Sequence, residues 1–449
     1  MRRPATNGSP QASRLLGLCV VLALSSGLAG CSSSGSTSTV TTTNITTTDA
    51  GGGTTPPQTA PPESLRLLLD STASIPDLGT DTIEVWICDV PLDTKDGRYN
   101  RVAFRLDLTP AGVAAELDDY VSAYFRTLSH GLYTPRFVAG GTDHMSASDT
   151  ANDCVAHALA GSAATSNAVL AVATAEHTAT VPGGFGIHGP PCTAVERRQC
   201  SASSTGRAAY VGASDFHPDW GPEPAVDLEE HEIGHLLGWP HSGDDSGEGH
   251  SSGLDIMSDS AAPRDFDATR RDGPDTLAVN RIAARWLPLD SVEIVNSTES
   301  TDSAESADSA DTASTPTAFD TRTATPEPKT QTFVLQPSFA ESGKRAIVIP
   351  LDATRLLMVD YLAKQGFDSF LPHSGVTVTL VDQSGAACGH ADATPCVGAD
   401  RVQSTKVGTA PFYDMLVAGD SATVEGWSIG VTEVGATATI QVARTPTTG

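Results

Sequence analysis

Three histidines and one glutamate stand close together in residues 231–241, which read His-Glu-Ile-Gly-His-Leu-Leu-Gly-Trp-Pro-His. His231 and His235 are four positions apart, so on a helix both imidazoles would project from one face and could bind one metal ion. Gly238 could end that helix and turn the chain, and His241 would then return as a third ligand. Three protein ligands leave the fourth tetrahedral position of zinc open, as a catalytic zinc site requires.

Glu232 directly follows the first of these histidines and is placed to act on water without being a ligand. Zinc held by three histidines would lower the pKa of water toward about 7 and polarise a carbonyl group. Glu232 would take the proton from the water and deliver it to a leaving amine, so the chemistry indicated is amide hydrolysis. The alternative is a solvated helix end whose histidines bind nothing. A chance match to five fixed identities in eleven positions is on the order of 1 in 10,000, which favours the single-zinc interpretation.

The pattern HExxHxxGxxH resembles the metzincin clan of zinc metallopeptidases. This resemblance implies an α+β catalytic domain, with a mixed twisted sheet, an active-site helix and a methionine-containing turn beneath the zinc. Leu254-Asp255-Ile256-Met257-Ser258 supplies a candidate turn, in which Met257 lies sixteen residues after His241. Some metzincins carry a tyrosine ligand two residues beyond that methionine. This chain has Asp259 there, so no tyrosine ligand is expected.

A second and looser resemblance begins after the zinc motif. The segment Tyr361-Leu362-Ala363-Lys364-Gln365-Gly366-Phe367-Asp368 is similar to the domain that follows the catalytic unit in gametolysin-like and immune-inhibitor-A-like peptidases. The immune-inhibitor branch usually has aspartate as its third ligand, whereas this chain has His241, so gametolysin-like is the closer label. The similarities cover roughly residues 208–290 and 333–382.

Alternating and helical hydrophobic patterns predict the elements that must position this site. Thr109-Pro110 should start a helix with one continuous apolar face as far as Leu128. Residues 207–213 are expected to be the edge strand that holds an extended peptide by backbone pairing, and 183–186 a loop at the rim of the cleft. The other expected strands are 83–88, 102–106, 135–138 and 168–172, and the other expected helices are 153–159 and 275–286.

The pattern turns to short strands after residue 331, which predicts a small all-β, sandwich-like domain. Valines and leucine alternate with threonines in 376–381, as a strand with one buried face would require. The remaining strand candidates in this part are 332–335, 346–349, 356–361 and 437–442.

The N-terminus has the features of an export signal. Arginines precede a short apolar run, and Leu28-Ala29-Gly30-Cys31 resembles a bacterial lipobox, which implies cleavage before Cys31 and lipid on its thiol. An ordinary signal peptide with an incidental cysteine is the alternative. We therefore expect a protein held at the extracytoplasmic membrane surface of a bacterium. The expected divisions are a signal peptide (1–30), a lipidated Ser/Thr-rich tether (31–62), the peptidase domain (63–296), an acidic linker (297–330) and the β-domain (331–449).

Six cysteines follow the tether, and an even number in an exported chain favours disulfides. Cys192–Cys200 and Cys388–Cys396 would each close a small loop, which leaves Cys88–Cys154 by elimination. Cys88 could instead be a latency thiol, but it lies in a hydrophobic strand pattern, so a structural role is favoured.

Charge and composition limit the partners. The formal net charge of −27 argues against nucleic-acid binding, and a polypeptide substrate is expected, while the oligomeric state is not indicated.

Asp244, Asp245 and Glu248 could favour Ca²⁺, but no EF-hand spacing supports it. His217 and His250 flank the motif and are expected to be surface or cleft residues, with a smaller chance of contacting substrate or a second ion.

Two other functions remain open from the sequence. The first is a surface-anchored binding lipoprotein whose metal site is not catalytic. Glu232 argues against it, because a structural zinc site has no need of a carboxylate base. The second is a zinc hydrolase of a substrate other than polypeptide, which the sequence separates poorly from a peptidase.

Overall fold

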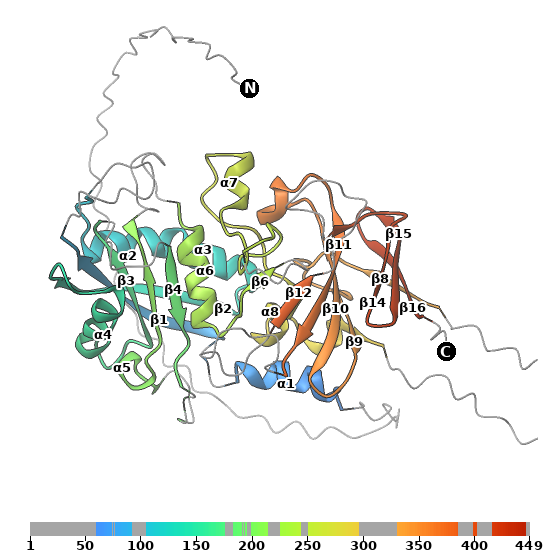
Figure 1. Ribbon diagram of the computed structural model, residues 1–449, viewed down its shortest axis with the longest axis horizontal. Coiled ribbons are helices and arrows are strands. Elements are labelled where there is room, and N and C mark those ends of the chain that lie inside the picture. Colours follow the sequence, from blue (N-terminus) through green and yellow to red (C-terminus); the bar gives the residue numbers. More distant parts are fainter. Residues whose placement is uncertain are drawn as a thin grey trace, which may run out of the picture. The chain divides into compact units, whose positions relative to one another are not determined.

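The first half of the protein is built on a five-stranded sheet in the computed structural model (Figure 1). The structure describes residues 60–73, 75, 77–91, 105–175, 183–190, 192, 194, 199–213, 225–243, 250–295, 330–384, 398–401 (backbone only) and 415–445. The strands of this sheet are β1 (Gly79–Asp89), β2 (Tyr133–His144), β3 (Ala168–Ala173), β4 (Gly184–Ile187) and β5 (Ala208–Val211).

The spatial order of the sheet is β2-β1-β3-β5-β4, in which β4 alone is paired antiparallel to its neighbour. A parallel sheet covered on both faces requires strands that are apolar throughout. β3 meets this requirement, since all six of its residues, Ala-Val-Leu-Ala-Val-Ala, are buried.

Helices cover both faces of this sheet. α2 (Pro110–Asp119), α3 (Val121–Leu128) and α6 (Asp227–Leu236) pack on one face, and α4 (Ala151–Gly161) and α5 (Ala202–Thr205) pack on the other. Thr109 caps α2 by accepting a hydrogen bond from Gly112 N at 3.1 Å, as expected for the start of this helix. The single long helix predicted over 110–128 is wrong, because the chain breaks at Tyr120 into α2 and α3.

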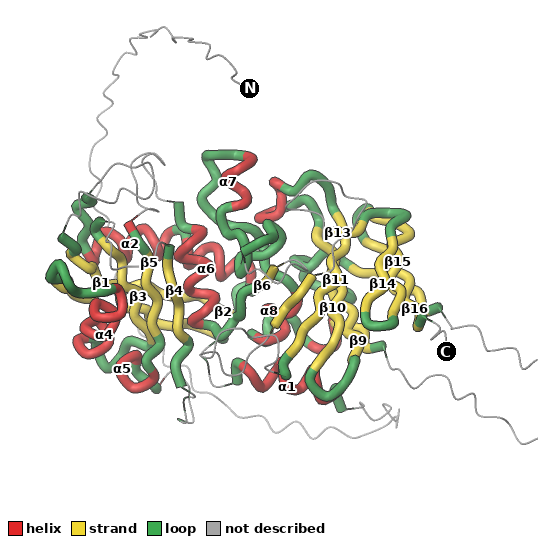
Figure 2. The backbone as a smooth tube through the Cα atoms, viewed as in Figure 1, coloured by secondary structure: helices red, strands yellow, loops and turns green. Residues whose placement is uncertain are grey.

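The second half of the protein consists mainly of two further sheets, which Figure 2 shows side by side. One has seven strands, namely β6 (Ser242–Gly243), β7 (Val292–Ile294), β9 (Ala346–Pro350), β10 (Arg355–Leu362), β11 (Gly375–Asp382), β12 (Gly398–Arg401) and β13 (Met415–Leu416). The other has four, namely β8 (Gln331–Leu335), β14 (Ser421–Val424), β15 (Trp427–Val434) and β16 (Ala438–Arg444).

One apolar cluster lies between these two sheets, with residues of β9, β10 and β11 facing residues of β15 and β16. The opposite face of the seven-stranded sheet packs on α1 (Glu63–Ser71) and α8 (Ala278–Ala283). Both faces of β11 are therefore covered. The expectation that it has one exposed face is wrong: Thr377 and Thr379 are buried, and Thr377 Oγ1 donates to Asp360 Oδ1 at 2.6 Å.

The seven-stranded sheet also includes two short strands from the range expected to be the peptidase domain, 63–296. β6 directly follows the zinc motif and pairs with β12, and β7 pairs with β9. Residues Ala60–Gly449 form one compact unit. α7 (Ala262–Phe266) and the two 3-10 turns Leu289–Ser291 and Gly366–Phe370 complete the described elements.

Two of the expected disulfides are present, Cys88–Cys154 and Cys192–Cys200. The third, Cys388–Cys396, lies outside the described residues, as do Cys31, His217, and the candidate calcium residues Asp244, Asp245 and Glu248. Of the strand expected at 102–106, residues 102–104 are also outside the described part, and Arg105 forms an isolated β-bridge with Ala175. The helix expected at 275–286 is shorter and spans Ala278–Ala283; Arg285, beyond its end, has a positive φ of 61°.

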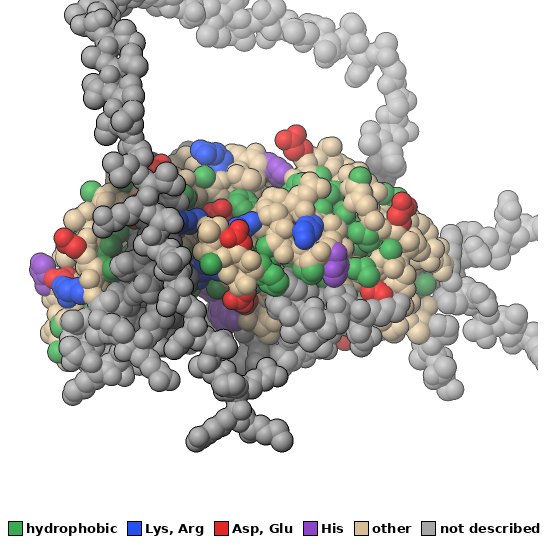
Figure 3. Space-filling model, turned by 90° about the horizontal axis from the view of Figure 1, so that it is seen from above, with side chains coloured by type: hydrophobic (Ala, Val, Ile, Leu, Met, Phe, Trp, Pro, Cys, Tyr) green, Lys and Arg blue, Asp and Glu red, His purple; other side chains and the backbone are tan. Residues whose placement is uncertain are grey.

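The described surface is mixed in character. On the face drawn in Figure 3, acidic, basic and apolar side chains are scattered among one another. No helix in the described part of the chain has both the length and the apolar composition needed to cross a membrane.

Candidate metal centre

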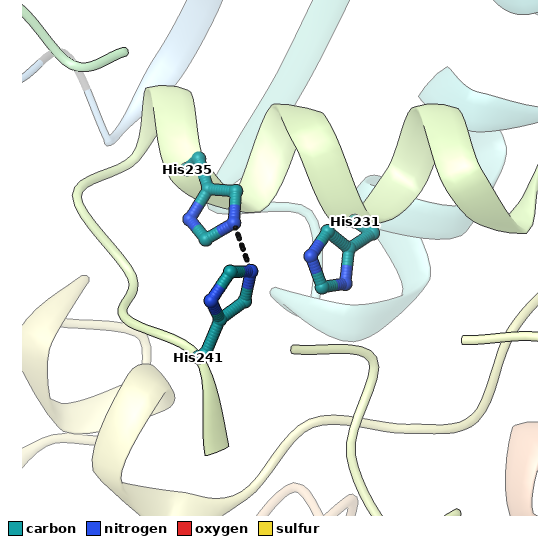
Figure 4. Close-up of side chains that lie close together, drawn as sticks. All are labelled: His231, His235 and His241. Carbon is teal, nitrogen blue, oxygen red and sulfur yellow. Dashed lines mark hydrogen bonds between the residues drawn. The ribbon is translucent and has the colours of Figure 1, made fainter. Parts of the chain in front are cut away.

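Helix α6 carries the first two histidines of the motif. His231 and His235 project from one face of α6, and the chain turns back after the helix so that His241 faces them (Figure 4). Gly238 makes this turn with a φ of 78°, a conformation that side-chain-bearing residues rarely adopt. The sequence expectation for the turn therefore agrees with the structure.

One ring nitrogen from each of these three histidines lies within 4.8 Å of the other two, so the three could hold a metal ion. His235 Nε2 and His241 Nε2 are 2.9 Å apart. Nitrogen ligands bind zinc at about 2.0–2.1 Å, so nitrogens gathered this closely need only small adjustments to share one ion. The donor set of three imidazoles suits zinc.

Backbone carbonyls orient two of the three rings. His231 Nδ1 lies 2.7 Å from Ile256 O, and His235 Nδ1 lies 2.8 Å from Trp239 O. A carbonyl oxygen only accepts hydrogen bonds, so each Nδ1 must carry the proton and each Nε2 keeps its lone pair. This is the arrangement that metal-binding histidines use, since the second nitrogen fixes both the tautomer and the orientation of the ring.

Burial keeps these two rings neutral. Burial is the largest cause of the lowering of the His231 pKa to about 3, and the nearby His241 lowers it further. Burial and then His231 lower the pKa of His235 to about 3 as well. Metal ligands must be deprotonated, so both imidazoles are ready to bind a cation at neutral pH.

Glu232 lies on the side of α6 that faces the edge strand β4. The side chain is buried, and a Cβ atom placed on Gly184 of β4 would stand 2.5 Å from Glu232 Oε1. A Cβ on Gly186 would similarly stand 2.5 Å from Glu232 O and from His235 Cβ. Residues two apart on a strand share a face, so these two glycines allow β4 to lie directly on the helix that carries the site.

The position of β4 corrects two expectations. Residues 183–186, expected to be a loop, contribute instead to strand β4. The strand expected at the edge, 207–213, becomes β5 and is flanked by β3 and β4. Glycines are weak strand formers, which is why the sequence favoured a loop; the spacing Gly-x-Gly could have indicated a strand face pressed against a helix.

Met257 is buried against α6. A Cβ on Gly234 of α6 would stand 2.3 Å from Met257 Sδ, so a larger residue there would displace the Met257 side chain. Met257 O accepts a hydrogen bond from Ser242 N at 2.9 Å, one residue after His241. The segment around Met257 thus contacts both the helix and the strand that follows the third histidine.

Asp255 is a buried residue near the site whose role the sequence did not indicate. Its carboxylate accepts hydrogen bonds from Ser242 Oγ at 2.5 Å, Thr276 Oγ1 at 2.9 Å and Asn280 Nδ2 at 3.3 Å. It therefore joins β6, the segment around Met257 and α8. Nothing in the motif spacing identifies this residue, because its partners are distant in sequence.

Comparison with solved structures finds distant structural likeness. An archaemetzincin from Methanopyrus kandleri is similar to this chain at 15% identity, over 46% of this chain and 96% of that chain, with a TM-score of 0.25. No protein-family model matches the chain, and no curated protein matches it.

Proposed function

We propose that this protein is a zinc-dependent endopeptidase of metzincin type, closest to the gametolysin-like branch. The observation that carries the proposal is the convergence of three imidazoles, with the buried Glu232 on the same helix as two of them. His231, His235 and His241 would hold one zinc ion, which when bound supplies an acidified water and a polarised carbonyl. The motif HExxHxxGxxH supports the metzincin label, and Met257 would be its turn methionine.

Glu232 acts in this proposal as general base and then as general acid. Its carboxylate would accept the proton of the attacking water and deliver it to the leaving nitrogen. The peptide amine is a poor leaving group, so this proton is needed for the C–N bond to break. The close approach of Gly184 confines the carboxylate to the side of α6 that faces β4.

The edge strand supports a polypeptide substrate over other hydrolysable substrates. Among the strands that the structure describes, β4 is the last of its sheet, and it lies directly over Glu232 and His235. An extended peptide can add to such an edge through main-chain hydrogen bonds. The carbonyl to be cleaved would then pass beside the three histidines. We also propose that the enzyme is exported and anchored through lipid on Cys31, so that it acts on extracytoplasmic proteins.

Zinc content and proteolysis of the purified full chain test this proposal. We expect about one zinc per chain and hydrolysis of an unstructured protein substrate. Glu232→Ala should keep the zinc and lose at least about a hundredfold in rate, the usual contribution of a positioned acid–base group. His241→Ala should instead weaken zinc binding, because it removes a ligand. Proteolysis that resists chelators, or no zinc bound after supplementation, would contradict the proposal.

A further inference from the structure

A fourth histidine stands against the three that could hold the ion. The His250 ring centroid is 4.2 Å from that of His241 and 5.2 Å from that of His231. The three motif histidines are separated from one another by 4.5–5.2 Å between ring centroids. His250 is therefore as close to two of the ligands as the ligands are to each other, although no motif spacing includes it.

The protonated ring nitrogen of His250 is the same one as in His231 and His235. His250 Nδ1 lies 3.0 Å from Ser258 O, and a carbonyl only accepts, so Nδ1 carries the proton. Nε2 then keeps its lone pair in the neutral ring. His231 and His235 have the same arrangement with Ile256 O and Trp239 O, and it is the arrangement that orients a metal-binding histidine.

The backbone of His250 is held in an unusual conformation. Its φ is +68°, which is uncommon for a residue other than glycine. Its amide donates to Ser242 O at 3.3 Å, one residue after His241. Side-chain-bearing residues in this region persist where the surrounding structure imposes them, and they gather at functional sites. Here the bonds to Ser242 and Ser258 place the ring next to His241.

We propose that His250 is a fourth imidazole ligand of the metal ion bound by His231, His235 and His241. The inference rests on the metal site of the proposed function and adds to its ligand set. The nitrogens already within 4.8 Å of one another belong to the three motif histidines and not to His250. The His250 ring stands beside His231 and His241, so it would have to shift toward the ion to become a ligand. Four protein ligands fill a tetrahedral site, so the water of the proposed reaction could reach the ion only by displacing His250 or by raising the coordination number to five.

Metal spectroscopy on the full chain tests this ligand directly. X-ray absorption of the zinc-loaded wild type should give four imidazole ligands, and His250→Ala should give three. The Co²⁺-loaded wild type and variant should differ in their visible absorption, which depends on coordination. Competition with a chromogenic chelator should show that His250→Ala weakens zinc binding at least about tenfold.

His144→Ala is the matched control. His144 also has its Nδ1 bonded, in this case to Asp89, but it is the last residue of β2 and its side chain is 80% exposed. The His144→Ala variant should have unchanged zinc affinity and an unchanged Co²⁺ spectrum. His250→Gln provides a second variant if the alanine variant fails to fold, and the count of imidazoles in the wild type needs no variant.

The outcomes separate this inference from the proposed function. Wild-type protein that binds zinc through three imidazoles, with a spectrum that His250→Ala does not alter, overturns the assignment of His250 and leaves the peptidase proposal standing. Wild-type protein that binds no zinc overturns both. Four imidazoles, falling to three in the variant, support the assignment.

Discussion

Gly184 on the edge strand lies directly against the carboxylate of Glu232 on the helix below it. A Cβ at Gly184 would stand 2.5 Å from Glu232 Oε1 and 2.5 Å from Tyr210 O. The second of these atoms belongs to the backbone of the neighbouring strand and cannot turn aside. The strand that is proposed to receive substrate thus also sets the space available to the proposed catalytic base.

Gly184→Ala should therefore lower catalytic rate without removing the metal. The added methyl group displaces either β4 or the Glu232 side chain, and a displacement of about 1 Å at a reacting group can cost about a hundredfold. We expect kcat to fall at least about tenfold while zinc content stays at the wild-type level. Gly435→Ala is the control, because nothing lies within 4 Å of the added atom there. Wild-type kcat in Gly184→Ala would show that the contact does not position Glu232.

Glu230, next to His231 in the chain, should make the stability of the protein depend on pH. Burial, followed by the charge of Asp272, raises the pKa of Glu230 well above 4.5. The folded protein thus keeps a proton that the unfolded chain releases above about pH 4.5. The free energy of unfolding should fall as pH rises from there toward the raised pKa.

Glu230→Gln removes this titration and keeps the shape of the side chain. Denaturant unfolding of the chelated protein at pH 5 and pH 8 should show a smaller loss of stability in the variant than in the wild type. The exposed Glu341→Gln serves as control and should follow the wild type. An equal loss in Glu230→Gln and wild type would show that Glu230 is not the group responsible.

The two described disulfides should differ in their contribution to stability. Cys88–Cys154 spans 66 residues and joins β1 to α4, whereas Cys192–Cys200 spans 8. Chain-entropy estimates give about 4 kcal/mol for the longer loop and about 2.5 kcal/mol for the shorter one. Unfolding of the Cys88→Ser/Cys154→Ser and Cys192→Ser/Cys200→Ser variants measures both values. A larger loss from the shorter loop would contradict the entropic account.

Cys31→Ser should release the protein from the membrane or leave an unprocessed precursor. Acyl chains contribute about 0.8 kcal/mol per buried methylene, so a protein with several chains binds almost permanently and one without them does not. Peptidase activity of the folded part should be unchanged. Cell fractionation measures whether the protein is bound to the membrane or released. A wild type found wholly in the medium, with its N-terminus elsewhere than Cys31, would exclude the lipid anchor.

The sequence predicts best what depends on short spacings. The placement of His231, His235 and His241 follows from helical periodicity and one glycine turn, and the structure brings their nitrogens together. Elements formed by contacts between distant segments were missed. β6 and β12 are short, and neither carries a hydrophobic pattern of its own. β6 pairs with β12, in which Ala399 lies opposite Ser242, and β12 also pairs with β11.

The sequence also does not show whether a second layer of structure covers the other face of a strand. The alternation in β11 indicated one exposed face, because Thr377 and Thr379 look like surface residues. The structure covers that face as well and provides a carboxylate, Asp360, for one of the hydroxyl groups. From the sequence, His250 is expected to be a surface or cleft residue and has no place among the three ligands, because its proximity to His241 arises from the fold of the following segment and from no repeat in the sequence.

Strand β6 has a consequence for how this protein can be divided. The two residues after His241 belong to the same sheet as β9–β12, so the third histidine is followed at once by backbone that the C-terminal half holds in place. A fragment that ends before residue 330 keeps the whole motif but loses the strand that pairs with Ser242 and Gly243. Such a fragment lacks the backbone partner of the residues that follow His241, so inactivity in it would not count against the chemistry proposed for the motif. Any shortened or recombined form of the chain would therefore have to keep the motif together with the C-terminal strands that pair with the residues after it.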